Sequence, residues 1–258
     1  EGRRPLMISA IVTTYMRLDC LKEWWEGFQK AVNSDQRARM RIIVVDNGRD
    51  ESTEWCYKQG LFCITPSHNL GHMGAINLVM KPEGDTLGDR VLLMDNDTVP
   101  TPGFLEPMME MADRGYDVVG ARLLFPDGRL QHCGIGFGLN HLPFMPLLGS
   151  AGDTPPALVD RPCPAATFAC VLMDRKMMES VGEMDEKFFT THGDVDYCLR
   201  AKELGFRIGY SARSVVYHKM WQAPGRLENI KEQTAYFKQK WLDAGRIYPV
   251  LGVWPIIL

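Results

Sequence analysis

An apolar run that ends in two carboxylates constrains this sequence more than any other segment. Residues 90–95 read RVLLMD, and Asp97 follows two positions later, before Pro100. The run predicts a buried strand that delivers Asp95 and Asp97 to the carboxyl edge of a parallel sheet, where open α/β folds bind their ligands. Carboxylates this close repel each other unless a positive charge lies beside them, so one interpretation is a divalent cation that carries a diphosphate. The other is a loop whose aspartates only start a turn.

Short apolar runs and helical patterns alternate through the first 115 residues. The runs typical of strands lie at 8–13, 41–48, 61–65 and 91–95, and the helical patterns at 19–28, 74–80 and 103–112. Alternation of this kind predicts a parallel sheet that is covered by helices on both faces and connected by short right-handed crossovers.

The second half of the chain is less regular. Its predicted elements are strands at 118–125, 133–138, 166–173 and 215–218, a capped helix at 193–205 and an amphipathic helix at 227–244. Residues 140–164 are rich in Pro, Gly and Leu, which predicts a mobile loop over the site. Because no linker or internal repeat appears, we expect a single domain over residues 1–258. Its nucleotide-binding half would extend to about residue 115, and its acceptor and catalytic half would begin at about residue 116.

Charge and cysteine content narrow the classes of partner. The formal net charge of the 258 residues is -3, which argues against binding to nucleic-acid polymers. The seven cysteines are odd in number and form no C-x-x-C pair, which indicates reduced core residues of a cytoplasmic protein. No apolar run is long enough to span a membrane. The closing apolar segment 250–258 is expected to dock on the domain, to touch a membrane surface peripherally, or to continue into a further region.

Polar residues follow three of the predicted strands. They occupy positions 13–15, 46–48 and 95–97. Parallel strands end at one edge of a sheet, so an acidic side chain there can reach a base or ribose while the D-x-D pair holds a metal and a diphosphate. Together the three loops predict a nucleotide site.

An ordered series of motifs resembles the family 2 glycosyltransferases of the GT-A fold, particularly the rhamnosyltransferase-like bacterial members. The motifs are VTTY at 12–15, VVDNG at 44–48, NLGHMGAIN at 69–77, MDND at 94–97, PDGRLQHCG at 126–134, GEMDE at 182–186, GDVDYCLR at 193–200 and YH at 217–218. The resemblance implies a Rossmann-like α/β domain with a mainly parallel central sheet flanked by helices. It also implies transfer of a hexosyl or deoxyhexosyl group, with inversion, from a nucleotide diphosphate sugar to a hydroxyl of a glycan, lipid-linked or small-molecule acceptor.

The resemblance assigns roles to individual residues. By it, Thr13, Tyr15 and Asp46 would hold the nucleotide base, and Asp95 the ribose side. Asp97 would bind the divalent cation, Mn²⁺ or Mg²⁺.

Further assignments each have a structural alternative. By the same resemblance His218 would complete the metal shell, although a lone histidine is often a core residue. Asn69, Gly71 and Gly74 would shape a loop near the nucleotide, where glycine allows close backbone approach, or would be an ordinary helix entry.

Asp194 matches the catalytic carboxylate of the family. The chemistry requires such a group, because an acceptor hydroxyl must lose its proton as it attacks. The sequence departs from the family pattern at Gly193, where many members carry Glu, and at Ala75 and Glu183, which replace frequent glycines. Asp196 is the alternative base, but a position in the first turn of a helix more simply makes it a capping residue.

Two functions from other classes are the alternatives. A nucleotidyltransferase that makes a nucleotide sugar normally needs a glycine-rich, basic phosphate loop after the first strand, and residues 13–19 contain no glycine. The same segment lacks the G-x-G-x-x-G of hydride-transfer enzymes. A catalytically degenerate nucleotide-sugar binding module is disfavoured because Asp95, Asp97, Asp194 and His218 are all present.

Overall fold

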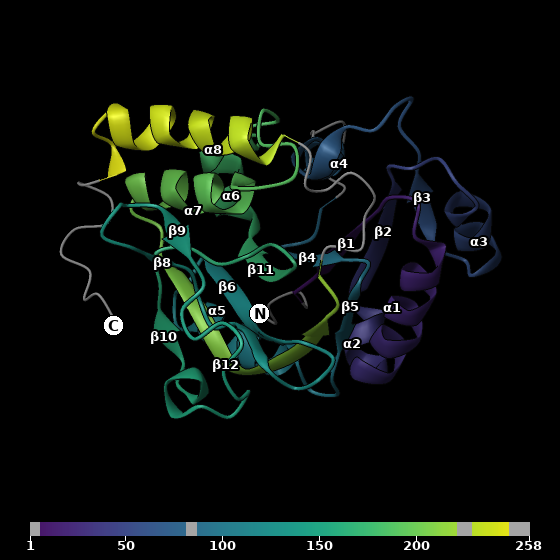
Figure 1. Cartoon of the computed structure of the whole chain (residues 1–258). Coiled ribbons are helices and arrows are strands. Elements are labelled where there is room, and N and C mark those ends of the chain that lie inside the picture. Colours follow the sequence, from purple (N-terminus) through teal and green to yellow (C-terminus); the bar gives the residue numbers. More distant parts are fainter. Residues whose placement is uncertain (1–5, 81–86, 221–228, 248–258) are drawn as a thin grey trace, which may run out of the picture.

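The chain forms a curved β-sheet with helices on both faces (Figure 1). It is described from a computed structural model, which covers residues 6–80, 87–220 and 229–247. The predicted closing segment 250–258 lies outside the described residues.

Strands and helices alternate in the first half, as the sequence predicts. The elements are β1 (Ile8–Thr14), α1 (Leu18–Ala31), α2 (Ser34–Ala38), β2 (Met40–Asp46), α3 (Ser52–Lys58), β3 (Phe62–Ile64), α4 (Gly71–Met80), β4 (Arg90–Asp95), β5 (Thr98–Pro100) and α5 (Leu105–Asp113). Helix α1 forms because apolar residues recur on one face, and Leu21, Trp24 and Phe28 of that face are fully buried.

The second half contains shorter elements. They are β6 (Val118–Leu124), β7 (Leu130–His132), β8 (Gly136–Phe137), β9 (Pro143–Phe144), a 3₁₀ helix (Pro155–Leu158), β10 (Arg161–Pro162), β11 (Cys170–Asp174), α6 (Arg175–Val181), α7 (Gly193–Glu203), β12 (Ile208–His218), α8 (Ile230–Phe237) and a π-helical segment (Lys238–Asp243).

Several predicted elements differ from the structure: for example, the strand expected at 215–218 is β12 (Ile208–His218), and only Gly136–Phe137 of the strand expected at 133–138 is a strand. The strand expected at 166–173 begins only at Cys170, which pairs with Met94. Its partner β4 ends at Asp95, so residues before Cys170 have no neighbouring strand residues with which to continue the pairing. The helix expected at 227–244 begins as α8 and continues as the π-helical segment, and its first two residues lie outside the described ranges. The expected loop 140–164 contains β9, the 3₁₀ helix and β10, which are too short to produce a periodic pattern.

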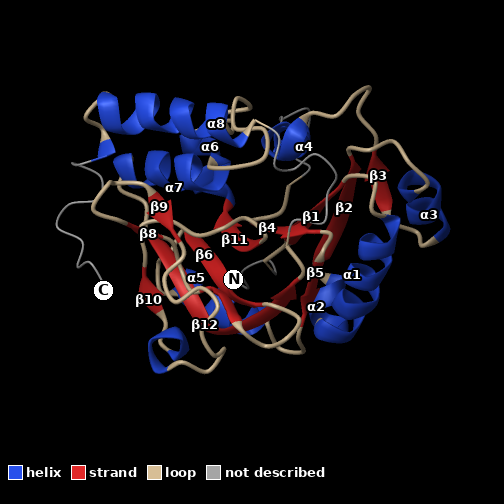
Figure 2. Ribbon diagram, viewed as in Figure 1, coloured by secondary structure: helices blue, strands red, loops and turns tan. Residues whose placement is uncertain are grey.

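One sheet includes strands from both halves (Figure 2). Its order is β10-β12-β6-β11-β4-β1-β2-β3, with β5 paired to β12 and β7 to β6. Strands β4, β1, β2 and β3 are parallel, as expected for the first half. Strand β11 lies antiparallel between β4 and β6, so the two parallel parts of the sheet are joined by a reversed strand.

The two faces of the sheet carry separate cores. Helices α4, α6, α7 and α8 cover one face, and α1, α3 and α5 cover the other (Figure 1). Because successive strand residues point to opposite faces, Ile11 belongs to the first core and Val12 to the second. None of the helices within the described ranges is long and apolar enough to cross a membrane.

His132 is a buried base at the junction of β6 and β7. Its Nδ1 lies 2.9 Å from the carbonyl oxygen of Ala121, and its Nε2 accepts a hydrogen bond from the amide of Thr167 at 3.3 Å. The carbonyl can only accept, so Nδ1 carries the proton of the neutral ring. Burial lowers the pKa of His132 from 6.5 to about 4.

This lowered pKa predicts a pH-dependent stability. Between pH 6.5 and about 4 the unfolded chain binds a proton at His132 that the folded chain does not. The free energy of unfolding should therefore fall as the pH is lowered through this range, by up to about 1.4 kcal/mol per pH unit. His132→Asn keeps a donor for the Ala121 carbonyl and should lose this contribution. Urea unfolding of both proteins across the range measures it, and identical pH slopes would contradict the assignment.

Candidate active site

The carboxyl ends of β1, β2 and β4 lie side by side. In the sheet register Thr14 pairs with Asp46, and Thr13 pairs with Asp95. The turn after β4 is tied to β1, because the side-chain amide of Asn96 donates to Thr14 Oγ1 at 2.8 Å. The three loops that the sequence singled out therefore share one edge of the sheet.

Asp95, Asp97 and His218 converge where β4 and β12 end. One ligand atom of each residue lies within 4.8 Å of the other two. His218 Nε2 and Asp97 Oδ1 are 3.1 Å apart, and both side chains are almost completely buried. Carboxylate oxygens suit Mg²⁺ and Mn²⁺, and imidazole nitrogen is a ligand for transition metals. The ligand atoms of Asp95, Asp97 and His218 therefore suit a divalent cation.

Gln131 of β7 fixes the orientation of the His218 ring. Its Nε2 donates to the His218 carbonyl at 3.1 Å, which identifies Oε1 as the atom 2.5 Å from His218 Nδ1. An amide oxygen can only accept, so Nδ1 carries a proton, and Nε2 is the ring nitrogen that faces Asp97. A lone pair that faces a carboxylate oxygen is unfavourable unless a cation or a proton lies between them. This arrangement is typical of a metal ligand held by a second hydrogen bond.

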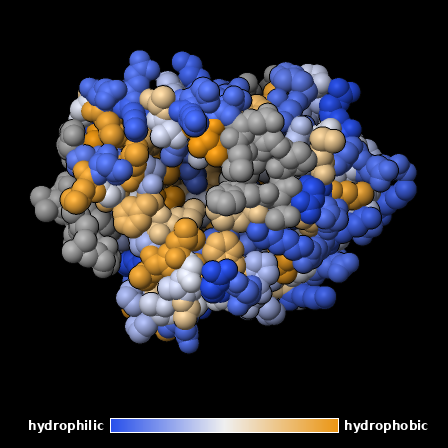
Figure 3. All heavy atoms as spheres, viewed as in Figure 1, coloured by the Kyte–Doolittle hydropathy of each residue, from blue (hydrophilic) through white to orange (hydrophobic). Residues whose placement is uncertain are grey.

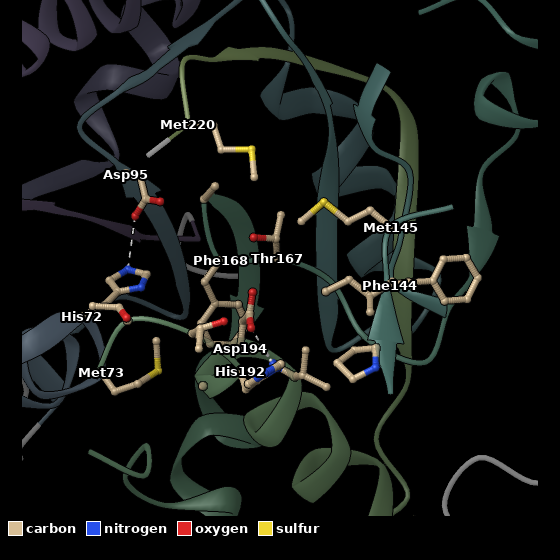
Figure 4. A pocket seen from close by; sticks show the side chains of 17 residues that line it. His72, Met73, Asp95, Phe144, Met145, Thr167, Phe168, His192, Asp194 and Met220 are labelled. Atoms are coloured by element: carbon tan, nitrogen blue, oxygen red, sulfur yellow. Dashed lines mark hydrogen bonds and ion pairs between the residues drawn. The ribbon is translucent and has the colours of Figure 1, made fainter. Parts of the chain in front are cut away.

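A cavity of about 240 Å³ lies beside this cluster (Figure 4). Asp95 and His72 form one wall, where His72 Nε2 is 3.2 Å from Asp95 Oδ1. Asp194 projects toward the cavity from the start of α7. The apolar lining consists of Met73, Ile135, Pro143, Phe144, Met145, Phe168, Ala169, Val195 and Met220. The cavity thus lies between Asp95, which belongs to the cluster, and Asp194, the predicted general base.

The two carboxylates at the start of α7 have different surroundings. Asp194 lines the cavity, and its Oδ1 accepts from the amide of Val195 at 2.8 Å. Asp196 is fully buried; its Oδ1 accepts from Trp241 Nε1 at 2.8 Å and lies 2.7 Å from Lys240 Nζ. Of the two, Asp194 is the carboxylate that a substrate in the cavity can reach, and its catalytic role stays a prediction.

Asparagine side chains shape the predicted nucleotide loop between β3 and α4. The Asn47 side chain donates to Asn69 Oδ1 at 2.7 Å and to the Gly71 carbonyl at 3.1 Å. Gly71 has a φ of +70°, and a Cβ there would lie 2.5 Å from the ring of Phe189, so both conformation and space require glycine. A Cβ on Gly74 would lie 2.9 Å from the nearest side chain. These residues therefore set the course of the loop without lining the cavity.

The residues predicted to hold the nucleotide base lie on the same edge of the sheet. Thr13 and Tyr15 are half-buried at the end of β1. Asp46 is fully buried, and its carboxylate accepts from the amide of Arg49 at 2.9 Å and from the Thr53 hydroxyl at 2.6 Å. Local groups thus occupy both oxygens of Asp46. Direct contact between this side chain and a base stays a prediction.

Sequence reasoning left three site residues without a role. His72 and His192 line the cavity, and Gln131 orients His218. His72 stands four residues after His68, but His68 precedes α4, so the two do not form the histidine pair of a metal helix. The sequence carried no sign that His72 and His192 line one cavity. Gln131 carried no signal in the sequence, because its three-residue strand β7 was not predicted and the burial of Leu130, Gln131 and His132 is visible only in the structure.

Apolar side chains gather around β8 and β9 on the face shown in Figure 3. Leu139 and Leu148 of this region are exposed, and Phe144 is both exposed and part of the cavity lining. The apolar wall of the cavity therefore reaches the protein surface.

Known proteins share this sequence pattern. Residues 9–181 match the family model described as Glycosyl transferase family 2. The O-antigen biosynthesis protein RfbC of Myxococcus xanthus is 31% identical over 172 residues, which cover 64% of this chain and 13% of that protein. The uncharacterized protein y4gI of Sinorhizobium fredii is 25% identical over 255 residues, which cover 91% of this chain and 27% of that protein. The chain therefore spans a small part of either relative.

A solved structure shares the fold. It is the mannosyltransferase PcManGT from Pyrobaculum calidifontis in complex with GDP-Man and Mn²⁺, with a TM-score of 0.66 and 15% identity. The match covers 95% of this chain and 67% of that one. The likeness confirms the GT-A fold that the sequence motifs implied. Because the family model matches more than half of the residues, the chain belongs to glycosyl transferase family 2.

Proposed function

We propose that this protein is a metal-dependent, inverting glycosyltransferase that moves a hexosyl or deoxyhexosyl group from a nucleotide diphosphate sugar to an acceptor hydroxyl. The observation that carries the proposal is the cavity between Asp95 and Asp194. One of its walls belongs to a cluster that suits a cation, and another carries a carboxylate that can accept a proton.

The donor would bind at the carboxyl edge of β1, β2 and β4. Its diphosphate would lie against Asp95, Asp97 and His218, where a bound Mn²⁺ or Mg²⁺ would offset the charge of the leaving group. The nucleotide base would bind at the edge of the sheet around Thr13 and Asp46. The structural neighbour that is bound to GDP-Man and Mn²⁺ supports a nucleotide-sugar donor and a cation of this kind.

Asp194 would act as the general base. It would take the proton of the acceptor hydroxyl while the acceptor oxygen bonds to the anomeric carbon and the bond from that carbon to the diphosphate oxygen breaks. The electron pair of the broken bond leaves with the diphosphate, so the protein need not supply an acid. Attack from the wall opposite the leaving group inverts the anomeric carbon. Asp194 lies in the N-terminal turn of α7, at the positive end of the helix dipole.

The cavity wall bears on the choice of acceptor. Phe144 and Met145 make this wall apolar, which suits an acceptor with an apolar part, such as a lipid-linked sugar. A cytoplasmic location and peripheral membrane contact through residues 250–258 stay predictions. The two other functions, nucleotidyl transfer and a degenerate binding module, have less support, because the chain belongs to a transferase family and places a reachable carboxylate in the cavity.

Asp97→Ala should weaken metal-dependent nucleotide binding, because it removes a carboxylate from the proposed cation site. We expect the affinity for UDP or GDP in the presence of Mn²⁺ to fall by at least about 10-fold, measured by calorimetric titration. Asp35→Ala, at an exposed position in α2, is the matched control and should bind as the wild type does. Unchanged affinity in Asp97→Ala, or wild-type binding that EDTA does not diminish, would contradict a metal held by Asp97.

His218→Asn tests the metal role of the histidine separately from its structural role. Asparagine can still donate to Gln131 Oε1 but lacks the nitrogen that faces Asp97. We expect weaker Mn²⁺ binding and a nearly unchanged melting temperature of the metal-free protein. A large loss of metal-free stability with unaltered metal binding would instead identify His218 as a core histidine.

Asp194→Asn keeps the size of the side chain but removes the basic site. We expect the transfer rate to fall by about 10²–10⁴, with donor affinity preserved. Asp196→Asn removes a buried carboxylate that pairs with both Lys240 and Arg200, and it should mainly lower the melting temperature. Transfer rates and donor affinities of both variants decide the assignment, since near wild-type turnover by Asp194→Asn would make Asp196 the leading candidate.

A further inference from the structure

Gln233 joins helix α8 to the segment that precedes α7. Its side chain is 4% exposed, and its Oε1 accepts from the amides of Thr190 at 2.9 Å and Thr191 at 3.0 Å. Its Nε2 donates to Thr190 Oγ1 and to the Asn229 carbonyl, each at 3.2 Å. All four hydrogen-bonding positions of this amide are therefore used. The contacts hold two neighbouring backbone amides that belong to no regular element.

The segment ends in a residue with a strained backbone. His192 has φ 62° and ψ -6°, a left-handed conformation that costs a non-glycine residue about 1 kcal/mol or more. Such a conformation persists only where the surroundings determine it. Here His192 Nε2 lies 3.0 Å from Thr234 Oγ1, and the ring packs on Phe237 with a centroid distance of 5.1 Å. Thr234 and Phe237 both belong to α8, so this helix fixes His192, which lies two positions before Asp194.

Helix α4 also contacts the chain just before this segment. The amide of His72 donates to the Phe189 carbonyl at 2.9 Å, and the side chain of Asn77 donates to the Met184 carbonyl at 2.9 Å. Thr190, Thr191 and His192 all line the cavity. A shift of this segment would therefore change the position of the predicted base relative to the acceptor.

We propose that Gln233 is a positioning residue for transfer: it sets the location of residues 190–194 in the cavity, and loss of its hydrogen bonds slows the reaction without weakening donor binding. The inference rests on the proposed role of Asp194. Within the described part of the chain, the hydrogen-bond partners of Gln233 lie outside the Asp95–Asp97–His218 cluster. A misplacement of about 1 Å at a reacting group can cost about 10²-fold in rate, so a change in these contacts would affect turnover strongly.

Gln233→Met tests the proposal, because methionine has a similar length and forms none of these hydrogen bonds. We expect faster hydrogen exchange at the amides of Thr190 and Thr191 and a decrease in kcat of about 10- to 100-fold. The affinity for UDP or GDP with Mn²⁺ should stay within about threefold of the wild-type value. Gln233→Glu retains the accepting oxygen and should restore the protection of both amides and part of the rate.

Gln36→Met is the matched control. It is the same substitution at α2, where Gln36 Oε1 accepts from the Asn33 amide at 2.9 Å and no residue of the helix is buried. It should change neither exchange at Thr190 and Thr191 nor the rate.

Three results would overturn the proposal: unaltered exchange at both amides in Gln233→Met, a kcat within about threefold of wild type, or equal losses of kcat and donor affinity. The exchange measurement needs no substrate, so it reports on the Gln233 contacts independently of the reaction. Wild-type turnover by Asp194→Asn would instead overturn the role of Asp194 as the general base, on which this inference rests, and leave the exchange result at Thr190 and Thr191 unaffected.

Discussion

Negative charge at the end of a buried strand is the constraint on which the rest of the site depends. The backbone around it is fixed by its own hydrogen bonds: Thr98 Oγ1 donates to the Asp95 carbonyl at 2.6 Å, and the Lys219 amide donates to the Asp97 carbonyl at 3.0 Å. The bond between Lys219 and Asp97 also brings the end of β12 to the turn that follows β4. His218 therefore reaches Asp97 because both chain segments are held by backbone contacts, and the side chains meet with little freedom to separate.

The reversed strand β11 places the second half of the chain at this edge. Because β11 runs antiparallel to β4, it begins opposite Met94 and ends opposite Arg90. The residues just before β11, Thr167 and Phe168, consequently line the cavity beside Asp95. A parallel strand at this position would have begun at the other edge of the sheet. The antiparallel insertion thus allows one sheet to present residues from both halves to one cavity.

Local patterns predicted the first half of the site and failed where contacts are distant in sequence. The runs that end at Thr14, Asp46 and Asp95 were identified because each is a continuous apolar strand followed by polar turn residues. The direction of β11 was not predictable, since an apolar run reads the same in either orientation. The two-residue strands β8 and β9 are too short for periodicity. The contacts of Gln233 with Thr190 cross more than forty residues, and no spacing rule encodes them.

One residue belongs to both sides of the cavity. The imidazole of His72 contacts Asp95, and its backbone amide bonds to the Phe189 carbonyl in the segment that leads to Asp194. Groups that share a partner generally show interaction energies, whereas distant and independent groups do not. The free-energy effects of substitutions at Asp95 and near Phe189 should therefore not be additive. Double-mutant cycles in this protein would need His72 as a third member before an energy could be apportioned to either side.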